Sequence, residues 1–389
     1  MENFVFQNTT KIIFGRDSEK NVGIETKKYS NKILLHYGSG SIKKYGLYEK
    51  IIKYLKEEGI EVIELPGVEP NPKISLVREG IKICRENSIN FILAVGGGSA
   101  IDSAKAISIG IPYGGDVWEF FERKANAKSA VPVGIVLTIP GSGSESSNVT
   151  VITNEEKLLK RGYHNQALLP KFAILNPELS FTLPPYQAAS GAADVMAHTM
   201  ERYFTQTKKA DLTDRLCESS LITVIENTPL VLANPEDYEG RAEIMWTSSI
   251  AHNGLLGTGR VEDWASHKLA HELSSYYGVT HGAALAIIFP AWMKYVYKQN
   301  IERFVQFAVR VLGVDACFGS QEQIILEGIR RLENFYKEIG LPITLKELDI
   351  NSEKFDEMAT KCVIFGSIGN FMKLNKDDVI NIYKLARPA

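Results

Sequence analysis

A carboxylate and several histidines recur at helical spacing in one part of the chain. Asp194 and His198 are four residues apart in GAADVMAHTMERYF, and His267 and His271 repeat that spacing in DWASHKLAHEL. On a helix, residues at i and i+4 project from one face, close enough to share an ion. With His281, this group includes four of the chain's seven histidines. A carboxylate with neutral imidazoles suits Fe(II) or Zn(II) better than Mg or Ca, so the pattern predicts a metal site.

The alternative is that each histidine is an ordinary solvated or hydrogen-bonded side chain, as a lone histidine on an amphipathic helix usually is. Two spaced pairs and a further histidine weigh against that interpretation. No cysteine lies near enough in sequence to suggest a thiolate ligand. The rest of the chain has to supply the context in which a metal would act.

Bulk properties exclude several classes of partner. The 389 residues are too many for one ordinary hydrophobic core, so length predicts about two domains. The composition is 44% hydrophobic and 23% charged with a net charge of −2, which gives no electrostatic reason to expect nucleic acid or an anionic membrane as a partner. We see no signal peptide and no apolar run long enough to span a bilayer.

The four cysteines are widely scattered and show no C-x-x-C pairing. Such spacing is typical of buried thiols in a reducing compartment, so we expect a cytoplasmic protein.

The first half of the chain alternates short β-branched runs with amphipathic stretches, which is typical of a parallel α/β sheet. The predicted strands are 32–37, 60–65, 91–95, 133–138 and 172–175. Helical periodicity predicts helices at 48–59 and 74–87 between them. The opening segment, FVFQNTTKIIFG, could form a hairpin, but its place in the sheet cannot be inferred.

From Pro184 onward the pattern is almost entirely helical, for example at 210–227, 239–254 and 324–340. We therefore predict an α/β nucleotide-binding domain at 1–178, with a Rossmann-like parallel sheet, and an all-helical domain at 179–389. The histidine-rich region falls in the helical domain.

Three of the predicted strands end in glycine-rich turns, and in a parallel sheet such turns emerge at the carboxyl edge, where ligands bind. Glycine lets the backbone approach a phosphate closely, and N–H groups at a helix N-terminus stabilise the anion. The turns contain Gly38, Ser39, Gly40 and Ser41; Gly96, Gly97, Gly98 and Ser99; and the segment TIPGSGSES at 138–146.

None of these turns is a G-x-G-x-x-G fingerprint, a Walker P-loop or a G-x-S-x-G nucleophile elbow. Each alone reads as a plain strand–helix connection, but three on one sheet edge favour binding. The residues therefore predict a phosphate-bearing cofactor on the first domain and a divalent metal in the second, facing each other across a cleft.

Together these motifs resemble the iron-containing (group III) alcohol dehydrogenases, and within them the butanol dehydrogenase and aldehyde reductase branch. The resemblance covers essentially the whole chain. It is carried by GGGSAIDSAK at 96–105, TIPGSGSE at 138–145, and the series D-x-x-x-H, H-x-x-x-H and H-G that starts at Asp194, His267 and His281. Ile139-Pro140 replaces a smaller pair of the family, which we expect to stiffen that turn.

Carried over by position, the resemblance implies a metal, Fe²⁺ or Zn²⁺, held by Asp194, His198, His267 and His281. The choice of His281 over His271 rests on the resemblance, which places His271 beside the metal, either in contact with a ligand or as a proton relay, and not as a ligand itself. It implies that Gly97, Gly98 and Ser99 hold the pyrophosphate. It also implies cofactor contacts at Asp102, Thr138, Ser142 and Lys160.

The activity so implied is reversible hydride transfer between nicotinamide and short-chain primary alcohols or aldehydes such as butanol and butanal. The metal would act as a Lewis acid that polarises the substrate oxygen. His271, the ribose hydroxyls or water would take the proton. The chain would thus be an NAD(P)-dependent oxidoreductase acting on CH–OH groups, and the family implies a homodimer.

The choice between NAD and NADP depends on what meets the adenosine ribose. A carboxylate after the strand favours NAD, because it accepts from the 2′-hydroxyl and repels a phosphate. The turn from Gly38 to Ser41 has no acid, and Lys43 and Lys44 follow it. We therefore expect NADP(H) to be favoured over NAD(H).

Three alternatives remain at this point. A dehydroquinate synthase-like lyase shares the architecture but needs a focused cluster of Arg and Lys beside the metal. A glycerol dehydrogenase-like enzyme has one metal ligand fewer. A non-catalytic nucleotide- or metal-binding scaffold would bind its cofactor without turnover.

Overall fold

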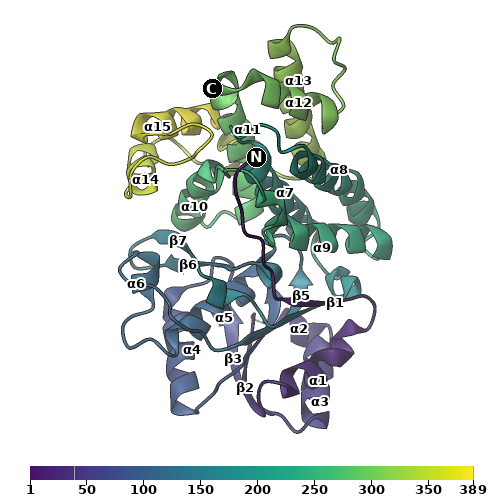
Figure 1. The fold of residues 1–389 in the computed structure, drawn as a ribbon, viewed down its shortest axis with the longest axis vertical. Helices are drawn as coiled ribbons and strands as arrows, with labels where there is room; N and C mark the ends of the chain where they lie inside the picture. Colours follow the sequence, from purple (N-terminus) through teal and green to yellow (C-terminus); the bar gives the residue numbers. More distant parts are fainter. Residues whose placement is uncertain (39, 389) are drawn as a thin grey trace. The chain divides into compact units, whose positions relative to one another are not determined.

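The computed structural model describes residues 1–38 and 40–388, which form two compact units. The α/β unit comprises Gln7–Leu183 and Pro235–Ser249, and the helical unit comprises Met1–Phe6, Pro184–Asn234 and Ile250–Ala389. The predicted fold class, a parallel α/β sheet followed by an all-helical part, is confirmed (Figure 1). The boundary near residue 178 stays a prediction.

A six-stranded parallel sheet forms the centre of the α/β unit, in the order β1-β8-β5-β4-β2-β3. The five predicted strands all lie in it. The bounds of the strands are β1 Lys11–Phe14, β2 Lys32–Gly38, β3 Glu61–Val68, β4 Ile92–Gly97, β5 Val133–Ile139 and β8 Phe172–Leu175, with β6 Val149–Asn154 and β7 Leu159–His164 in a separate antiparallel pair.

Both faces of the sheet are covered because its strands are apolar at successive positions. On β2, Ile33 and Leu35 pack into the core under α1 and α3, whereas Leu34 packs into the core under α4 and α5. The covering helices of this unit are α1 Val22–Lys27, α2 Ser41–Lys44, α3 Leu47–Glu57, α4 Ile74–Glu86, α5 Gly98–Gly110 and α6 Trp118–Phe121 (Figure 1).

The strand order reverses between β2 and β4. From β2 the chain runs outward to β3, and then it returns to place β4 on the other side of β2 and continues towards β8. Such a topological switch point is where open α/β sheets bind ligands, at the carboxyl ends of the strands. The turns that begin at Gly38 and Gly96 follow β2 and β4, so they lie at this point.

The helical unit is built around α11, which is buried along most of its length as its sequence HGAALAIIFPAWMKYV predicts. Its Ala and Gly positions let neighbouring helices approach closely. The other helices are α7 Pro185–Tyr203, α8 Asp211–Ala233, α9 Tyr238–His252 (shared with the α/β unit), α10 Ala265–Tyr277, α11 His281–Val296, α12 Ile301–Arg310, α13 Gln321–Glu338, α14 Phe355–Cys362 and α15 Lys376–Leu385 (Figure 1).

The opening segment forms no hairpin in the described residues. Only Lys11–Phe14 is a strand, and it pairs in parallel with β8. Asn8 explains the difference, because its side chain accepts from the Thr10 N–H and donates to the Ser146 carbonyl, which anchors the turn to another segment. The β6–β7 hairpin, in contrast, is present in the structure but was not predicted from the sequence pattern.

One described helix, α8, is long and apolar enough by length and composition alone to cross a membrane. In the structure, however, its Asp214 bonds Arg260 and its Glu218 accepts from Tyr203, and both partners belong to the helical unit. These buried polar contacts attach one face of α8 to the rest of the helical unit.

Candidate metal centre and cofactor turns

The structure brings together three of the four predicted metal ligands. Asp194 on α7, His267 on α10 and His281 at the start of α11 each offer a donor atom, and these atoms lie within 4.8 Å of one another. The Nε2 atoms of both histidines are 3.9 Å from Asp194 Oδ1. Three helices, far apart in the sequence, thus converge on one point.

His198, the fourth predicted ligand, lies beside this group. Its Nδ1 donates to the Asp194 carbonyl at 2.8 Å, as expected one turn further along α7, and is 3.3 Å from Asp194 Oδ1. Its ring centroid is 4.5 Å from that of His267. His271 stands one turn beyond His267, with its ring centroid 5.2 Å from that of His281.

A fifth histidine, His252 at the end of α9, was not singled out from the sequence. Its ring centroid is 4.3 Å from that of His198 and 5.6 Å from that of Trp264. No helical spacing links His252 to the other histidines. The only signal in the sequence is that it lies between His198 and His267.

The donor set fits a borderline divalent metal. One buried carboxylate lies among imidazoles, and a set of oxygen and nitrogen donors of this kind suits Fe²⁺ or Zn²⁺. The residues present therefore fit the metal that the family resemblance implies.

Close packing of α11 against α7 helps to position His281. A Cβ on the next residue, Gly282, would overlap the backbone carbonyl oxygen of Ser190 on α7. A side chain there would push the two helices apart. Glycine at 282 therefore lets His281 approach Asp194.

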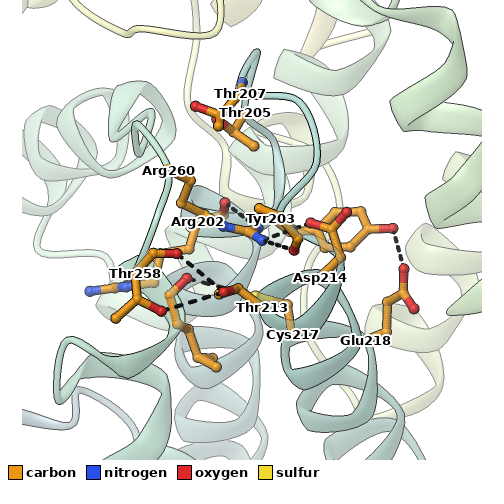
Figure 2. Close-up of polar contacts among 12 residues, drawn as sticks. Arg202, Tyr203, Thr205, Thr207, Thr213, Asp214, Cys217, Glu218, Thr258 and Arg260 are labelled. Carbon is orange, nitrogen blue, oxygen red and sulfur yellow. Dashed lines mark hydrogen bonds and ion pairs between the residues drawn. The ribbon is translucent and has the colours of Figure 1, made fainter. Parts of the chain in front are cut away.

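A buried polar cluster fixes the C-terminal end of α7 (Figure 2). Arg260 donates to the Arg202 carbonyl at 3.1 Å and to Asp214 of α8 at 2.7 Å, while the Tyr203 hydroxyl donates to Glu218 at 2.9 Å. Charged groups that are buried must be paired, so these contacts constrain α7 strongly. The helix that carries Asp194 and His198 is thereby held in place.

In the α/β unit, the turn after β4 presents bare backbone. Gly96 has a φ of +158°, Gly97 ends β4, and α5 begins at Gly98. A Cβ on Gly97 would crowd Ile139, and one on Gly98 would overlap the Ser142 side chain. The turns after β4 and β5 are thus in contact, and the N–H groups that start α5 are available to an anion.

Two charged residues of α5, Asp102 and Lys105, bond to the segment that follows β5. Asp102 accepts from the Ser144 hydroxyl at 2.6 Å and from the Val151 N–H at 3.1 Å. Lys105 donates to the carbonyls of Ser144, Ser147 and Val149. Both side chains are buried, which raises the pKa of Asp102 to about 6 and lowers the pKa of Lys105 to about 8.

In this structure Asp102 attaches the segment after β5 to α5. Its predicted contact with the cofactor stays a prediction. Lys105 was not predicted, because a lysine on a helix usually faces solvent. Thr138 lies on β5, one residue before Ile139.

Lys160 lies on β7, where its ammonium donates to the Asn71 side chain at 2.8 Å. Asn71 was not predicted either. Its φ of +58° marks it as a special backbone position, and the signal in the sequence was the Pro-Asn-Pro at 70–72.

The turn after β2 contains Gly40, with a φ of +153°, and Ser41, the first residue of α2. Ser39 lies outside the described residues. The turn itself contains no carboxylate, but one lies close to it. Glu64, on the neighbouring strand β3, is 3.7 Å from Lys43. Glu64 also accepts from the hydroxyls of Tyr37 and Tyr48, which lower its pKa although burial alone would raise it.

Comparison with known proteins defines the class. Residues 9–177 match the model of the iron-containing alcohol dehydrogenases, and residues 188–387 match the C-terminal model of the same family. The chain belongs to the iron-containing alcohol dehydrogenase family. It is an oxidoreductase, an alcohol dehydrogenase of the butanol dehydrogenase and aldehyde reductase branch.

Individual relatives cover the whole chain. It is 44% identical to a probable NADH-dependent butanol dehydrogenase of Bacillus subtilis over 384 residues, 99% of each chain. It is 35% identical to the NADPH-dependent aldehyde reductase YqhD of Escherichia coli, which it covers completely. The crystal structure of an NADH-dependent butanol dehydrogenase from Thermotoga maritima superposes with a TM-score of 0.96 at 40% identity, over 100% of this chain and 99% of that one.

Proposed function

We propose that this alcohol dehydrogenase interconverts short-chain primary alcohols and aldehydes, such as butanol and butanal, by hydride transfer to and from a nicotinamide cofactor. The observation that carries the proposal is the convergence of Asp194, His267 and His281 within 4.8 Å in a chain whose other unit has glycine turns at the switch point of a parallel sheet. Relatives named for butanol and aldehydes support the substrate class.

The proposed metal ligands are Asp194, His198, His267 and His281, and the metal is Fe²⁺ or Zn²⁺. A metal held there supplies Lewis-acid polarisation of the substrate oxygen. The helices that carry these residues fix the site before substrate arrives, so little reorganisation is needed.

The chain's own residues supply the rest of the chemistry. His271, whose ring centroid is 5.2 Å from that of His281, is the residue that we assign to proton exchange near the site. The backbone of Gly97, Gly98 and Ser99, at the start of α5, would hold the pyrophosphate of the cofactor. The hydride chemistry itself belongs to the nicotinamide, and the protein contributes alignment.

For the cofactor, we retain NADP(H) over NAD(H). The turn from Gly38 to Ser41 has no acid in its sequence, and Lys43 and Lys44 supply positive charge beside it. Glu64 offsets part of the charge of Lys43, so the preference should be modest. The relatives include both NADH-dependent and NADPH-dependent enzymes, in agreement with a small difference in free energy.

A homodimer and a cytoplasmic location complete the proposal. Strand β1 is an edge strand that ends at Phe14. Phe14 and Trp246 are 41% and 43% exposed, and their ring centroids are 6.3 Å apart. An open edge with exposed aromatics favours pairing with a second copy of the chain. The four cysteines are free thiols, which suits a reducing compartment.

A kinetic panel tests the proposal. Purified enzyme with a full metal site is given a series of short aldehydes with NADPH or NADH, and consumption of the reduced cofactor is followed. We expect turnover with butanal and a larger kcat/KM with NADPH. Absence of turnover across the panel, with metal and nucleotide both bound, would favour a lyase or a binding scaffold instead.

A further inference from the structure

Glu201 is a buried carboxylate that the sequence analysis did not single out. It lies on α7 seven residues after Asp194 and three after His198, so the three side chains project from one face of the helix. Its exposed fraction is 1%. A buried carboxylate needs partners, and those of Glu201 lie on and just before α10.

Both oxygens of Glu201 accept from nitrogen donors. Oε1 is 2.8 Å from His267 Nδ1 and 2.9 Å from the His267 backbone nitrogen. Oε2 accepts from the Trp264 backbone N–H at 2.5 Å. With a carboxylate on Nδ1, that nitrogen carries the proton, and the lone pair of His267 is at Nε2, which is 3.9 Å from Asp194 Oδ1.

The contact with Trp264 adds a second constraint. Trp264 precedes α10 with a φ of +67°, a left-handed conformation that is costly for a residue with a bulky side chain. Its indole nevertheless lies against the ligand cluster, with ring centroids 5.0 Å from His267 and 5.9 Å from His198. The same carboxylate thus fixes where α10 begins and how its first histidine is turned.

From these contacts we propose that Glu201 is the positioning residue of the metal centre, acting through His267. It orients the imidazole, keeps Nε2 towards the metal and increases the basicity of the ligand. The inference rests on the function proposed above only in taking the Asp194 cluster as the metal site. It adds a residue that touches neither metal nor substrate but sets the affinity of the site.

The test is Glu201→Gln in the full chain. Every partner of Glu201 is a donor, so an amide would direct its own N–H₂ group at an N–H group and lose at least one of the three bonds. Co²⁺ is titrated into chelated protein, and its visible absorption is recorded. We expect affinity to fall by about 10–100-fold and the absorption bands to shift, because changes around a ligand histidine have effects of this size.

The matched control is Glu327→Gln. Glu327 is a glutamate of the same unit whose side chain is 10% exposed, and it accepts from Arg330 and Arg331 on its own helix rather than from a candidate ligand. We expect its Co²⁺ affinity and spectrum to equal those of the wild type. Should Glu201→Gln fail to fold, Glu201→Asp, which keeps two acceptor oxygens on a shorter side chain, carries the same expectation of weakened Co²⁺ binding.

A double-mutant cycle separates positioning through His267 from a general structural role. In a His267→Ala background, Glu201→Gln should change the remaining Co²⁺ affinity by less than about twofold. The inference would be overturned if the two substitutions lowered Co²⁺ affinity independently, so that the double variant lost the product of the two single losses. It would also be overturned if Glu201→Gln kept the affinity and the spectrum of the wild type. If the wild-type protein itself binds no Co²⁺, the metal site and the proposed function fail together with it.

Discussion

The two candidate sites are built from different parts of the polypeptide. In the helical unit, side chains of Asp194, His267 and His281 make the site, and helices bring them together. In the α/β unit, the site is mostly backbone, exposed by glycines, and held by the buried charges of Asp102 and Lys105. A site made of side chains is therefore specified by the residues that bind. A site made of backbone depends on other residues, which hold its loops in place.

The largest effect should come from removing the charge that holds the cofactor loops. Lys105→Met keeps the length of the side chain but donates no hydrogen bond, so several buried carbonyls lose their donor and Asp102 loses a nearby positive charge. Loss of one member of a buried charged group costs ~3–5 kcal/mol. We expect urea unfolding to show this loss and nucleotide binding to fall with it.

The control for that change is Lys157→Met in the same unit, since the Lys157 side chain is 52% exposed. It should alter the free energy of unfolding by no more than ~0.5 kcal/mol. A loss below ~1 kcal/mol in Lys105→Met would mean that the loops are held by other contacts.

The next effect is a dependence on pH that belongs to the α/β unit. His36 on β2 is fully buried, with Nδ1 2.8 Å from the Leu65 carbonyl and Nε2 2.8 Å from the Ser103 hydroxyl. Burial lowers its pKa from 6.5 to about 4. Between these values the unfolded chain binds more protons, so the free energy of unfolding falls as pH falls, by about 3 kcal/mol in total.

The measurement is the urea midpoint of wild type and His36→Gln as pH is lowered through this range. Glutamine at position 36 does not titrate there, whereas all other groups are unchanged, so the difference in stability between the two proteins should shrink at acid pH. His164→Gln, at an exposed position of β7, should keep the wild-type slope. Parallel curves for wild type and His36→Gln would contradict the assignment.

Two glycines sharpen the contrast between the sites. Gly282→Ala places a Cβ against backbone of α7, which cannot yield, so we expect ~1–3 kcal/mol of destabilisation and weaker metal binding. Gly98→Ala meets only the Ser142 side chain, so stability should change less while nucleotide affinity falls.

Metal and nucleotide titrations of both variants check this crossed pattern. Gly114→Ala, where a Cβ would meet no heavy atom within 4 Å, is the reference. Equal effects of both substitutions on both ligands would remove the distinction drawn between a side-chain site and a backbone site.

The smallest effect concerns cofactor choice. Glu64→Gln removes the carboxylate 3.7 Å from Lys43 and frees that charge for a 2′-phosphate. Because the pair is partly exposed, the ratio of kcat/KM for NADPH over NADH should rise by no more than about fivefold. Glu61→Gln, at an exposed position of the same strand, should leave the ratio unchanged, and a fall in Glu64→Gln would refute the charge argument.

Much of the fold could be predicted because the sequence patterns of strands and of helices are both clear. The five β-branched runs are strands of the sheet, and the residues with helical spacing at 194–198 and 267–271 lie on α7 and α10. Each of these patterns is local, so sequence spacing expresses it directly.

What spacing could not reveal depends on tertiary packing. Glu201 shares a face of α7 with Asp194 and His198, but its contact with His267 crosses to another helix. His252 likewise reaches His198 from α9, so spacing within one helix shows neither contact. Lys105 resembles a solvated helix lysine until the loop from Ser144 to Val149 closes over it. The glutamate beside Lys43 came from another strand, so a search of the turn alone missed it.

The most direct test of the central claim is removal and restoration of the metal. Enzyme treated with a chelator is assayed with butanal and NADPH or NADH, before and after addition of Zn²⁺ or Fe²⁺, beside His267→Ala treated in the same way. The account predicts that chelation abolishes cofactor oxidation, that metal restores it in the wild type, and that His267→Ala stays more than ~100-fold less active. Unchanged turnover in metal-free enzyme, or in His267→Ala, would contradict it.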